Sequence, residues 1–218
     1  MDRTQHLYAP PTGIALAKVT DSSDSKSRGL VKVTLIGINL DVWASCLVPS
    51  AGAKNGNGYG IAMLPKNDEI VLVAFLSPEQ VFVLGSVWSG GSTQPGESTP
   101  VEQRYAVKTP SGTTMVFDDS GPSLSITTPA NNSITLTDSG GGSCTVQLGG
   151  TSIQTTTDSV TVTTTSSVQI QTSTLSVTAA SVSVNAAMSQ FSGVVQCDTL
   201  IATSVVGTTY TPGAGNIW

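Results

Sequence analysis

The sequence has 218 residues, enough for one large or two small domains, and its 39% hydrophobic content excludes a disordered chain. Charged residues make up 11%, against roughly 25% in an ordinary globular domain, and Ser, Thr and Gly take their place. No apolar run approaches the roughly 20 residues that cross a bilayer, and the N-terminus lacks the apolar core of a signal peptide. We therefore expect a soluble protein rich in repetitive β structure.

Charge is distributed unevenly along the chain. All nine Lys and Arg residues lie at or before Lys108, whereas residues 109–218 carry five Asp and no basic residue. A nucleic-acid binder needs basic side chains to neutralise phosphates, so this class is excluded for the C-terminal half. The three cysteines, Cys46, Cys144 and Cys197, are far apart and odd in number, which predicts buried free thiols rather than a disulfide framework.

The first half of the chain reads as short strands separated by turns. In GLVKVTLIG, residues 29–37, apolar and polar side chains alternate with the period of a strand. The run EIVLVAFL, which starts at Glu69, is continuously apolar and suits a strand buried on both faces. Turns are expected at 21–26 and 51–58 from their Gly, Asn, Ser and Asp content. The predicted strands, which suggest a small closed barrel, are 13–20, 30–36, 41–48, 59–64, 69–75 and 81–87.

A linker-like segment, SGGSTQPGESTP at 89–100, separates this half from a second kind of β pattern. Apolar residues then recur at positions i and i+2 within Ser/Thr runs, in steps of seven or eight residues. The predicted core residues of this region are Val146, Leu148, Ile153, Val160, Val162, Val168, Ile170, Leu175, Val177, Val182 and Val184.

A seven-residue step can also indicate a coiled coil, but the pattern here differs from one. A coiled coil places its apolar residues at i and i+3 among helix formers with charged flanks. Here the partner is at i+2, the residues are mostly β-branched and the flanks are Ser and Thr, which favours strands. One repeat spans at most roughly 25 Å, about one side of a triangular prism. Three repeats of one chain, or one repeat from each of three chains, would close that prism, and periodicity does not choose between them.

Several spaced segments together resemble a known family. They are GLVKVTL, DVWASCLVPSAG, GYGIAMLPKNDEIVLVAF and VFVLGSVWSG, within residues 29–90, followed by RYAVKTPSGTTMVFDDS at 104–120. In this order they resemble the phage baseplate assembly protein V family, the spike proteins of contractile injection systems, which are related to the spikes of type VI secretion. The chain departs from the pattern at Thr113, where many relatives have His.

The resemblance implies an all-β homotrimer with an N-terminal OB-like barrel and a C-terminal intertwined β-helix that forms a needle. Its parts would be an arm at 1–12, the OB-fold domain at 13–90, a linker at 91–103, the needle at 104–206 and a tip segment at 207–218. The family role is that of a central spike, which caps the tube or hub and pierces the target envelope. Such a protein is made in the bacterial cytoplasm and ends in the tail baseplate of a virion or in an injection particle.

The same resemblance implies two protein partners. A hub or baseplate protein would meet the OB collar, with the N-terminal arm as a candidate contact. At the other end, the cluster Tyr210, Pro212, Ile217 and Trp218 would cap the trimer or seat a tip protein of the PAAR type. The needle itself would touch the target membrane only transiently.

The sequence carries no pattern for catalysis or metal binding, so we expect no enzyme activity, no cofactor and no nucleic-acid partner. His6 is the only histidine, and the His-x-His pair with which some needles of the family hold iron is missing. Asp118 and Asp119 are expected in a turn rather than as a calcium-binding or catalytic pair, because neighbours on a strand would point to opposite faces and could not share one substrate. Trp43, Trp88 and Tyr59 are expected as core or contact residues, since the basic groove of an oligonucleotide-binding OB-fold is missing.

Two other classes of β-rich protein provide alternatives. A receptor- or polysaccharide-binding tail fibre would show aromatic residues along its shaft for sugar stacking, but only Phe191 precedes Tyr210 in the repeat region. A β-helical carbohydrate lyase or hydrolase would need carboxylates clustered on one face, which five scattered Asp residues do not provide. Both classes are therefore weaker interpretations than the spike.

Overall fold

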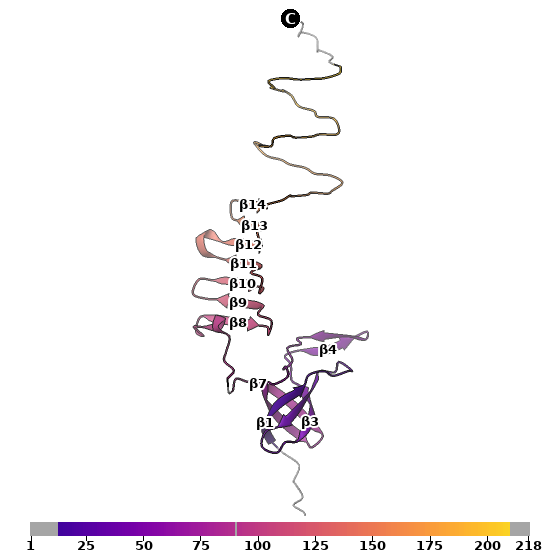
Figure 1. Cartoon of the computed structure of the whole chain (residues 1–218), viewed down its shortest axis with the longest axis vertical. Coiled ribbons are helices and arrows are strands. Elements are labelled where there is room, and N and C mark those ends of the chain that lie inside the picture. Colours follow the sequence, from indigo (N-terminus) through magenta and orange to yellow (C-terminus); the bar gives the residue numbers. More distant parts are fainter. Residues whose placement is uncertain (1–12, 90, 210–218) are drawn as a thin grey trace, which may run out of the picture. The chain divides into compact units, whose positions relative to one another are not determined.

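A computed structural model describes residues 13–89 and 91–209 of the chain and shows an all-β protein (Figure 1). Within these residues the only helices are two short 3₁₀ turns, Gly96–Ser98 and Ser139–Gly141. None of the helices in this part of the chain is long and apolar enough to span a membrane. The chain divides into two compact units, Met1–Val168 and Gln169–Trp218.

The first part of unit one is a closed five-stranded barrel with strand order β1-β2-β3-β7-β6. Its antiparallel pairs are completed by a short parallel pair between β3 and β7, at Ser45–Phe82 and Cys46–Val83. The predicted barrel is therefore confirmed. The strands are β1 (Gly13–Asp21), β2 (Leu30–Leu35), β3 (Asp41–Cys46), β6 (Ile70–Ser77) and β7 (Gln80–Val87).

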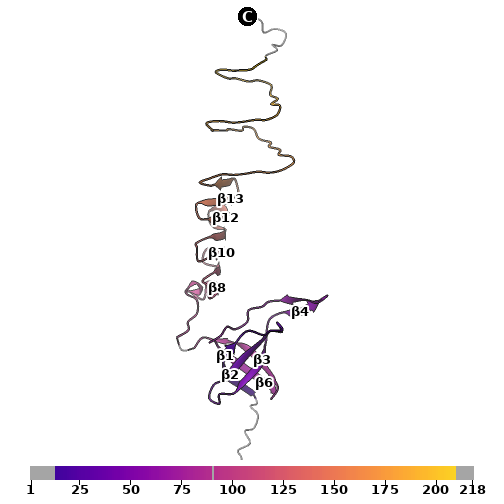
Figure 2. The same ribbon diagram turned by 45° about the vertical axis from the view of Figure 1, so that its right-hand side comes forward.

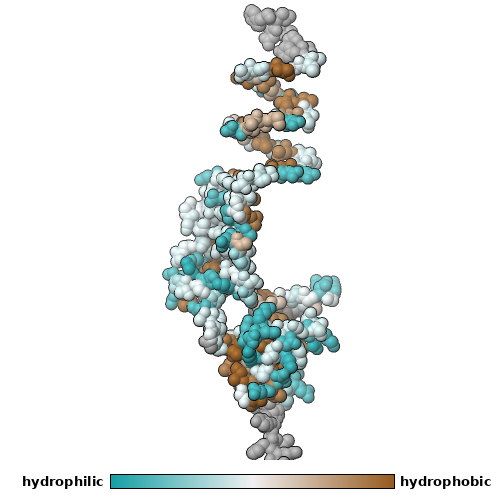
Figure 3. All heavy atoms as spheres, viewed as in Figure 1, coloured by the Kyte–Doolittle hydropathy of each residue, from teal (hydrophilic) through white to brown (hydrophobic). Residues whose placement is uncertain are grey.

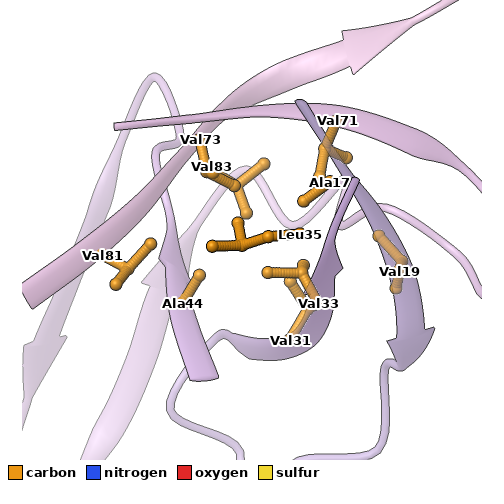
Figure 4. Close-up of a cluster of buried hydrophobic side chains, with 10 residues drawn as sticks. All are labelled: Ala17, Val19, Val31, Val33, Leu35, Ala44, Val71, Val73, Val81 and Val83. Carbon is orange, nitrogen blue, oxygen red and sulfur yellow. The ribbon is translucent and has the colours of Figure 1, made fainter. Parts of the chain in front are cut away.

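The barrel interior is filled by alternate residues of each strand, as period-two patterning requires. On β2 the residues Val31, Val33 and Leu35 point inward, as the alternation of GLVKVTLIG predicts. Strand β6 is expected to be buried on both faces, but only Val71 and Val73 are fully buried, because no described residue covers its outer face. Figure 4 shows the complete core: Ala17, Val19, Val31, Val33, Leu35, Ala44, Val71, Val73, Val81 and Val83.

The region between β3 and β6 differs from the sequence prediction. The expected turn at 51–58 is a two-stranded hairpin made of β4 (Ala51–Lys54) and β5 (Asn57–Gly60). Asn55 and Gly56 form its tip with positive φ values of 53° and 79°, as a two-residue Asn-Gly hairpin turn requires. The strand expected at 59–64 ends at Gly60, and residues 61–69 form no strand.

The remainder of unit one contains a seven-stranded antiparallel sheet in which every strand pairs with the next along the chain. This meander differs from both arrangements considered for the prism, because successive repeats run back and forth in one sheet. One chain therefore supplies one sheet. Its strands are β8 (Arg104–Lys108), β9 (Thr114–Asp118), β10 (Ser123–Thr127), β11 (Ser133–Thr137), β12 (Ser143–Leu148), β13 (Thr151–Thr156) and β14 (Val160–Thr163).

Unit two has a different backbone. Its described residues, 169–209, contain no strand or helix, and all of them are exposed. Figures 1 and 2 show this segment as extended passes that wind back and forth about one direction. No strand of the described part of the chain pairs with this segment, and the expected seven-residue step stays a prediction there.

Candidate functional site: an uncovered apolar sheet face

The hairpin turns of the seven-stranded sheet keep its strands in strict register. The β8–β9 turn TPSGT at 109–113 and the β10–β11 turn TPANN at 128–132 share one geometry. In each, the first Thr N–H donates to the carbonyl oxygen of the fifth residue, at 2.9 Å in both turns. The fourth residue has positive φ, 92° at Gly112 and 58° at Asn131. This is the three-residue hairpin loop in which a type I turn is followed by a left-handed residue.

The register stacks two rows of mostly apolar side chains on one face of the sheet. Opposite pairs such as Ile126–Ile134 and Val146–Ile153 continue from strand to strand without a shift. The first row is Val107, Met115, Ile126, Ile134, Val146, Ile153 and Val162. The second row is Tyr105, Phe117, Leu124, Leu136, Cys144, Thr155 and Val160. We call these two rows the apolar face.

The opposite face of the same sheet is polar. Its central row contains only two apolar residues, followed by five Ser, Thr or Gln residues: Ala106, Val116, Ser125, Thr135, Thr145, Gln154 and Thr161. A sheet with one apolar and one polar face normally buries the apolar face against another layer. The sequence therefore specifies which side of this sheet is to be covered.

No second layer covers the apolar face within the described part of the chain. Tyr105, Ile134, Leu136 and Val160 are 65%, 48%, 51% and 69% exposed. The residues of the buried hydrophobic core all belong to barrel strands. Monomeric proteins rarely leave contiguous apolar patches of this kind in water, and such patches mark contact sites. The apolar face is therefore the strongest candidate for a functional surface.

Ion pairs fix the start of the sheet. Arg104 Nε donates to Asp118 Oδ2 at 2.7 Å, and Ser120 donates to the same carboxylate from its backbone and its hydroxyl group. The hydrogen bonds from Ser120 and Arg104 lower the pKa of Asp118 to about 2. Lys108 Nζ lies 2.7 Å from Glu97 Oε1, and its hydrogen bond lowers the pKa of Glu97.

These hydrogen bonds give Asp118, the first of the two neighbouring aspartates, a structural role. The expected turn begins only at Asp119, because Asp118 is the last residue of β9, and its carboxylate accepts the hydrogen bonds of Ser120 in that turn. No group of three or more His, Cys, Asp and Glu residues that could hold a metal ion occurs in the described ranges.

The predicted needle-core residues fall in two places. Val146, Ile153, Val160 and Val162 lie on the apolar face, and Leu148 ends the same strand as Val146. The other six occur after the last strand, where their side chains are exposed: Val168, Ile170, Leu175, Val177, Val182 and Val184. Their burial in a needle stays a prediction. Tyr210, Pro212, Ile217 and Trp218 lie outside the described residues, as do His6 and the N-terminal arm.

Sequence reasoning missed most of the apolar face, from Tyr105 to Cys144. The signal was present, because the pairs YxV, MxF, LxI, IxL and CxV have the same i and i+2 spacing as the later pairs. Longer and unequal turns separate them, so they do not share the seven-residue step by which the later pairs were found.

Other expectations about side chains need correction. The three cysteines are free, but Cys144 and Cys197 are exposed and Cys46 is only partly buried, so the prediction of buried thiols is wrong for a single chain. Partial burial raises the pKa of the Cys46 thiol. Trp43, Tyr59 and Trp88 are 44%, 63% and 65% exposed and do not belong to the barrel core. Their role as contact residues stays a prediction.

The outer wall of the barrel also carries exposed apolar side chains. A shallow hollow of about 300 Å³ is lined by Leu47, Ala74, Phe75, Leu76, Phe82 and Leu84. Further exposed apolar residues lie on β1 and in the β2–β3 connection: Ile14, Leu16, Ile36, Ile38 and Leu40. Figure 3 shows hydrophobic residues at the surface of the barrel and along the wound segment of unit two.

The strand order β1-β2-β3-β7-β6, closed by a parallel pair, is that of an OB-like barrel, and the exposed apolar side chains of the barrel wall and of the sheet indicate an assembly component. Comparison with protein families is more specific. Residues 15–88 match the model of the type VI secretion system/phage-baseplate injector OB domain, and this part of the chain belongs to that family.

The recognised resemblance to the baseplate protein V family is thus confirmed. The family is a structural one, and it gives the chain a role in the baseplate or injector of a contractile system. Membership of a baseplate family indicates assembly with other baseplate proteins. The match does not extend to the seven-stranded sheet or to the residues beyond it. No curated protein matches the chain.

Proposed function

We propose that this chain is the central spike of a contractile tail or injection system, present as a homotrimer that caps the tube or hub and pierces the target envelope. The single observation that carries the proposal is the apolar face. It belongs to the same chain as an injector OB domain and has no cover among the described residues. A spike built from several copies would provide that cover without any further protein.

The size of the apolar face supports an obligate assembly. Each fully buried Val, Leu, Ile or Phe side chain contributes about 1.5–3 kcal/mol relative to its exposed state. Twelve of the fourteen positions in the two rows hold large apolar side chains, the exceptions being Cys144 and Thr155. Even partial burial of these side chains contributes more free energy than the few kcal/mol of net stability expected for the sheet of one chain alone.

Three sheets around one axis form a prism whose interior is lined by the three apolar faces. The polar faces then point to water, which suits Thr135, Thr145 and their neighbours. A closed prism also leaves no long free sheet edge along its sides, and stacked strands of this kind resist bending. Those are the mechanical properties that a puncturing element needs.

The partners at the two ends belong to the same proposal. The exposed apolar wall of the barrel, including Leu47, Leu76 and Leu84, supports contact between the collar and a hub or baseplate protein. The C-terminal cluster of Tyr210, Pro212, Ile217 and Trp218 would cap the needle or seat a PAAR-type tip protein, and truncation at Gly207 followed by infection or secretion assays tests that role. In this arrangement the assembled protein resides in a virion tail baseplate or an injection particle.

The test of the assembly is the native mass of the purified chain. We expect three times the 22.2 kDa of one protomer. Leu136→Asp places a charge on the apolar face and should yield monomers. Thr135→Asp, the adjacent residue on the polar face, is the matched control and should stay trimeric. A wild-type monomer or dimer would contradict the proposal, as would an unchanged mass for Leu136→Asp.

The piercing role needs a separate test in the assembled particle. Gold-labelled antibody against the chain should bind at the distal end of purified particles, before the sheath contracts. Particles that carry Leu136→Asp should lose their killing or infection activity. Label along the fibres or at the head instead of the tail tip would contradict the spike and favour a tail-fibre role.

A further inference from the structure

Residues 165–209 lack the backbone pairing that the strands of the seven-stranded sheet have. In the sheet, each strand finds its backbone partners within its own chain. From Thr165 to Thr209 no residue belongs to a strand or helix, no hydrogen bond joins two backbone groups, and all the side chains are exposed. The same chain therefore contains one segment with its backbone satisfied internally and one without.

Residues 165–209, whose backbone groups have no backbone partner, nevertheless repeat the apolar pattern of a buried strand. Val168/Ile170, Leu175/Val177 and Val182/Val184 keep the i and i+2 spacing of the apolar face. If these side chains are buried, the adjacent N–H and C=O groups leave water and need partners. The described part of one chain offers none, so neighbouring copies are the natural source of these partners.

The junction between the two segments is anchored on the last hairpins of the sheet. Thr151 Oγ1 donates a hydrogen bond to Thr164 Oγ1 at 3.2 Å in a partly buried position. Gly150, in the β12–β13 turn, lies so close to Thr165 that an added Cβ would be 3.4 Å from its Cγ2 atom. These two contacts fix the path of the chain as far as Thr165, where it leaves the sheet.

The two segments differ in the cost of association. Sheets that are already formed associate by their faces and lose mainly rigid-body freedom. Residues 165–209 must in addition fix their backbone, at roughly 1–2 kcal/mol for each residue, during association. Once three sheets hold three chains together, the wound segments meet at high effective concentration, and that cost is then offset within one particle.

We propose that the needle assembles in two stages, and that contact between the apolar faces of three β8–β14 sheets precedes and is required for ordering of residues 165–209. The wound segments then exchange strands between chains, starting next to Thr164 and proceeding toward the C-terminus. Residues 165–209 stabilise the trimer once it has formed but do not initiate its formation. This inference depends on the trimer proposed above.

The test compares two variants of the full-length chain. The face variant is Leu136→Asp, on β11. The segment variant is Leu175→Asp, in the wound segment, with Thr174→Asp beside it as a control. Native mass gives the number of chains, and hydrogen exchange followed by peptide analysis gives the protection of residues 165–209.

We expect the wild type to be trimeric and protected throughout 165–209. The segment variant should keep three chains and lose protection only in peptides from 165–209. The face variant should lose both the trimer and the protection. The milder Leu136→Ser, if it remains a mixture of states, should show protection of 165–209 that rises with protein concentration together with the trimer fraction.

Two results would overturn the two-stage order: dissociation of the segment variant into monomers, or protection of 165–209 in a face variant that no longer forms trimers. A wild-type chain that is monomeric would instead contradict the proposed trimer itself. Protection of barrel strand β6 is measured in every variant, so that general unfolding is recognised as a separate event.

Discussion

Arg104 and Asp118 face each other across the first two strands of the seven-stranded sheet, and Arg104 Nε lies 2.7 Å from Asp118 Oδ2. Arg104 also donates to the Thr99 carbonyl oxygen at 3.2 Å, while Lys108 reaches Glu97. The last two basic residues of the sequence thus hold the preceding segment against β8, the terminal strand of the sheet. Since an exposed terminal strand invites further pairing, these charges also protect that edge.

The Arg104–Asp118 pair predicts a specific loss of stability in acid. Because the pKa of Asp118 is lowered from 3.8 to about 2, its contribution is complete above pH 3.8 and is lost as the pH falls through about 2. Asp118→Asn should therefore lower the melting temperature at pH 6 and reduce its further decline between pH 4 and pH 2. Asp158→Asn, the same charge change in the β13–β14 turn, is the control. Equal acid dependence in wild type and Asp118→Asn would contradict the assignment.

The shared hairpin geometry predicts different effects for two substitutions in the turns, a loss of stability for Gly112→Ala and almost none for Asn131→Gly. Gly112 has a φ of 92°, so Gly112→Ala should destabilise the sheet by roughly 1–2 kcal/mol through backbone strain. The new methyl group would meet Pro129 Cγ only at 3.6 Å, an ordinary contact, so packing adds little. Asn131→Gly, at φ 58°, should be close to neutral. Thermal unfolding of the two variants at the same protein concentration measures the difference, and similar losses for both would exclude this explanation.

The barrel was predictable from sequence because its signals are local. In β2, the alternation of Val31, Val33 and Leu35 with Lys32 and Thr34 identifies both the strand and its buried side. The hairpin of β4 and β5 was missed, since its glycine-rich strands have low β propensity and lie apart from the core. The Asn55-Gly56 dipeptide was a valid hairpin signal that composition alone concealed.

The candidate site was predictable only in part, for a reason that lies in the turns. From Val146 onward the connections are short, and the constant step revealed the apolar pairs. Before Val146, turns such as 109–113 and 128–132 change the spacing, although Met115/Phe117 and Ile134/Leu136 have the same pattern. The pairing of strands within one chain, rather than around a prism, depends on turn geometry that periodicity does not describe.

The barrel core predicts a large effect for one truncation. Leu35 is 1% exposed at the centre of the core, so Leu35→Ala should destabilise the barrel by about 2–5 kcal/mol. Leu40→Ala is the control, because Leu40 is 42% exposed in the β2–β3 connection. Urea unfolding is followed through the fluorescence of Trp43 and Trp88 in a Trp218→Phe background, which reports on the barrel. A loss below about 1 kcal/mol for Leu35→Ala would show that Leu35 is not central to the core.

The polar face predicts how the needle interacts with membranes. Residues 109–218 contain no basic side chain, and we expect this to limit adhesion to anionic lipids and lipopolysaccharide during passage. Ser125, Thr135 and Thr145 lie opposite one another on β10, β11 and β12. Replacing all three with Lys should increase binding to vesicles that contain phosphatidylglycerol, since each Lys near such a surface contributes about 1 kcal/mol. Infection or killing by particles with the triple Lys variant should decrease. A triple Gln variant at the same positions should match the wild type in both assays. Unchanged activity of the Lys variant would mean that Thr and Ser are present only as good strand-surface residues.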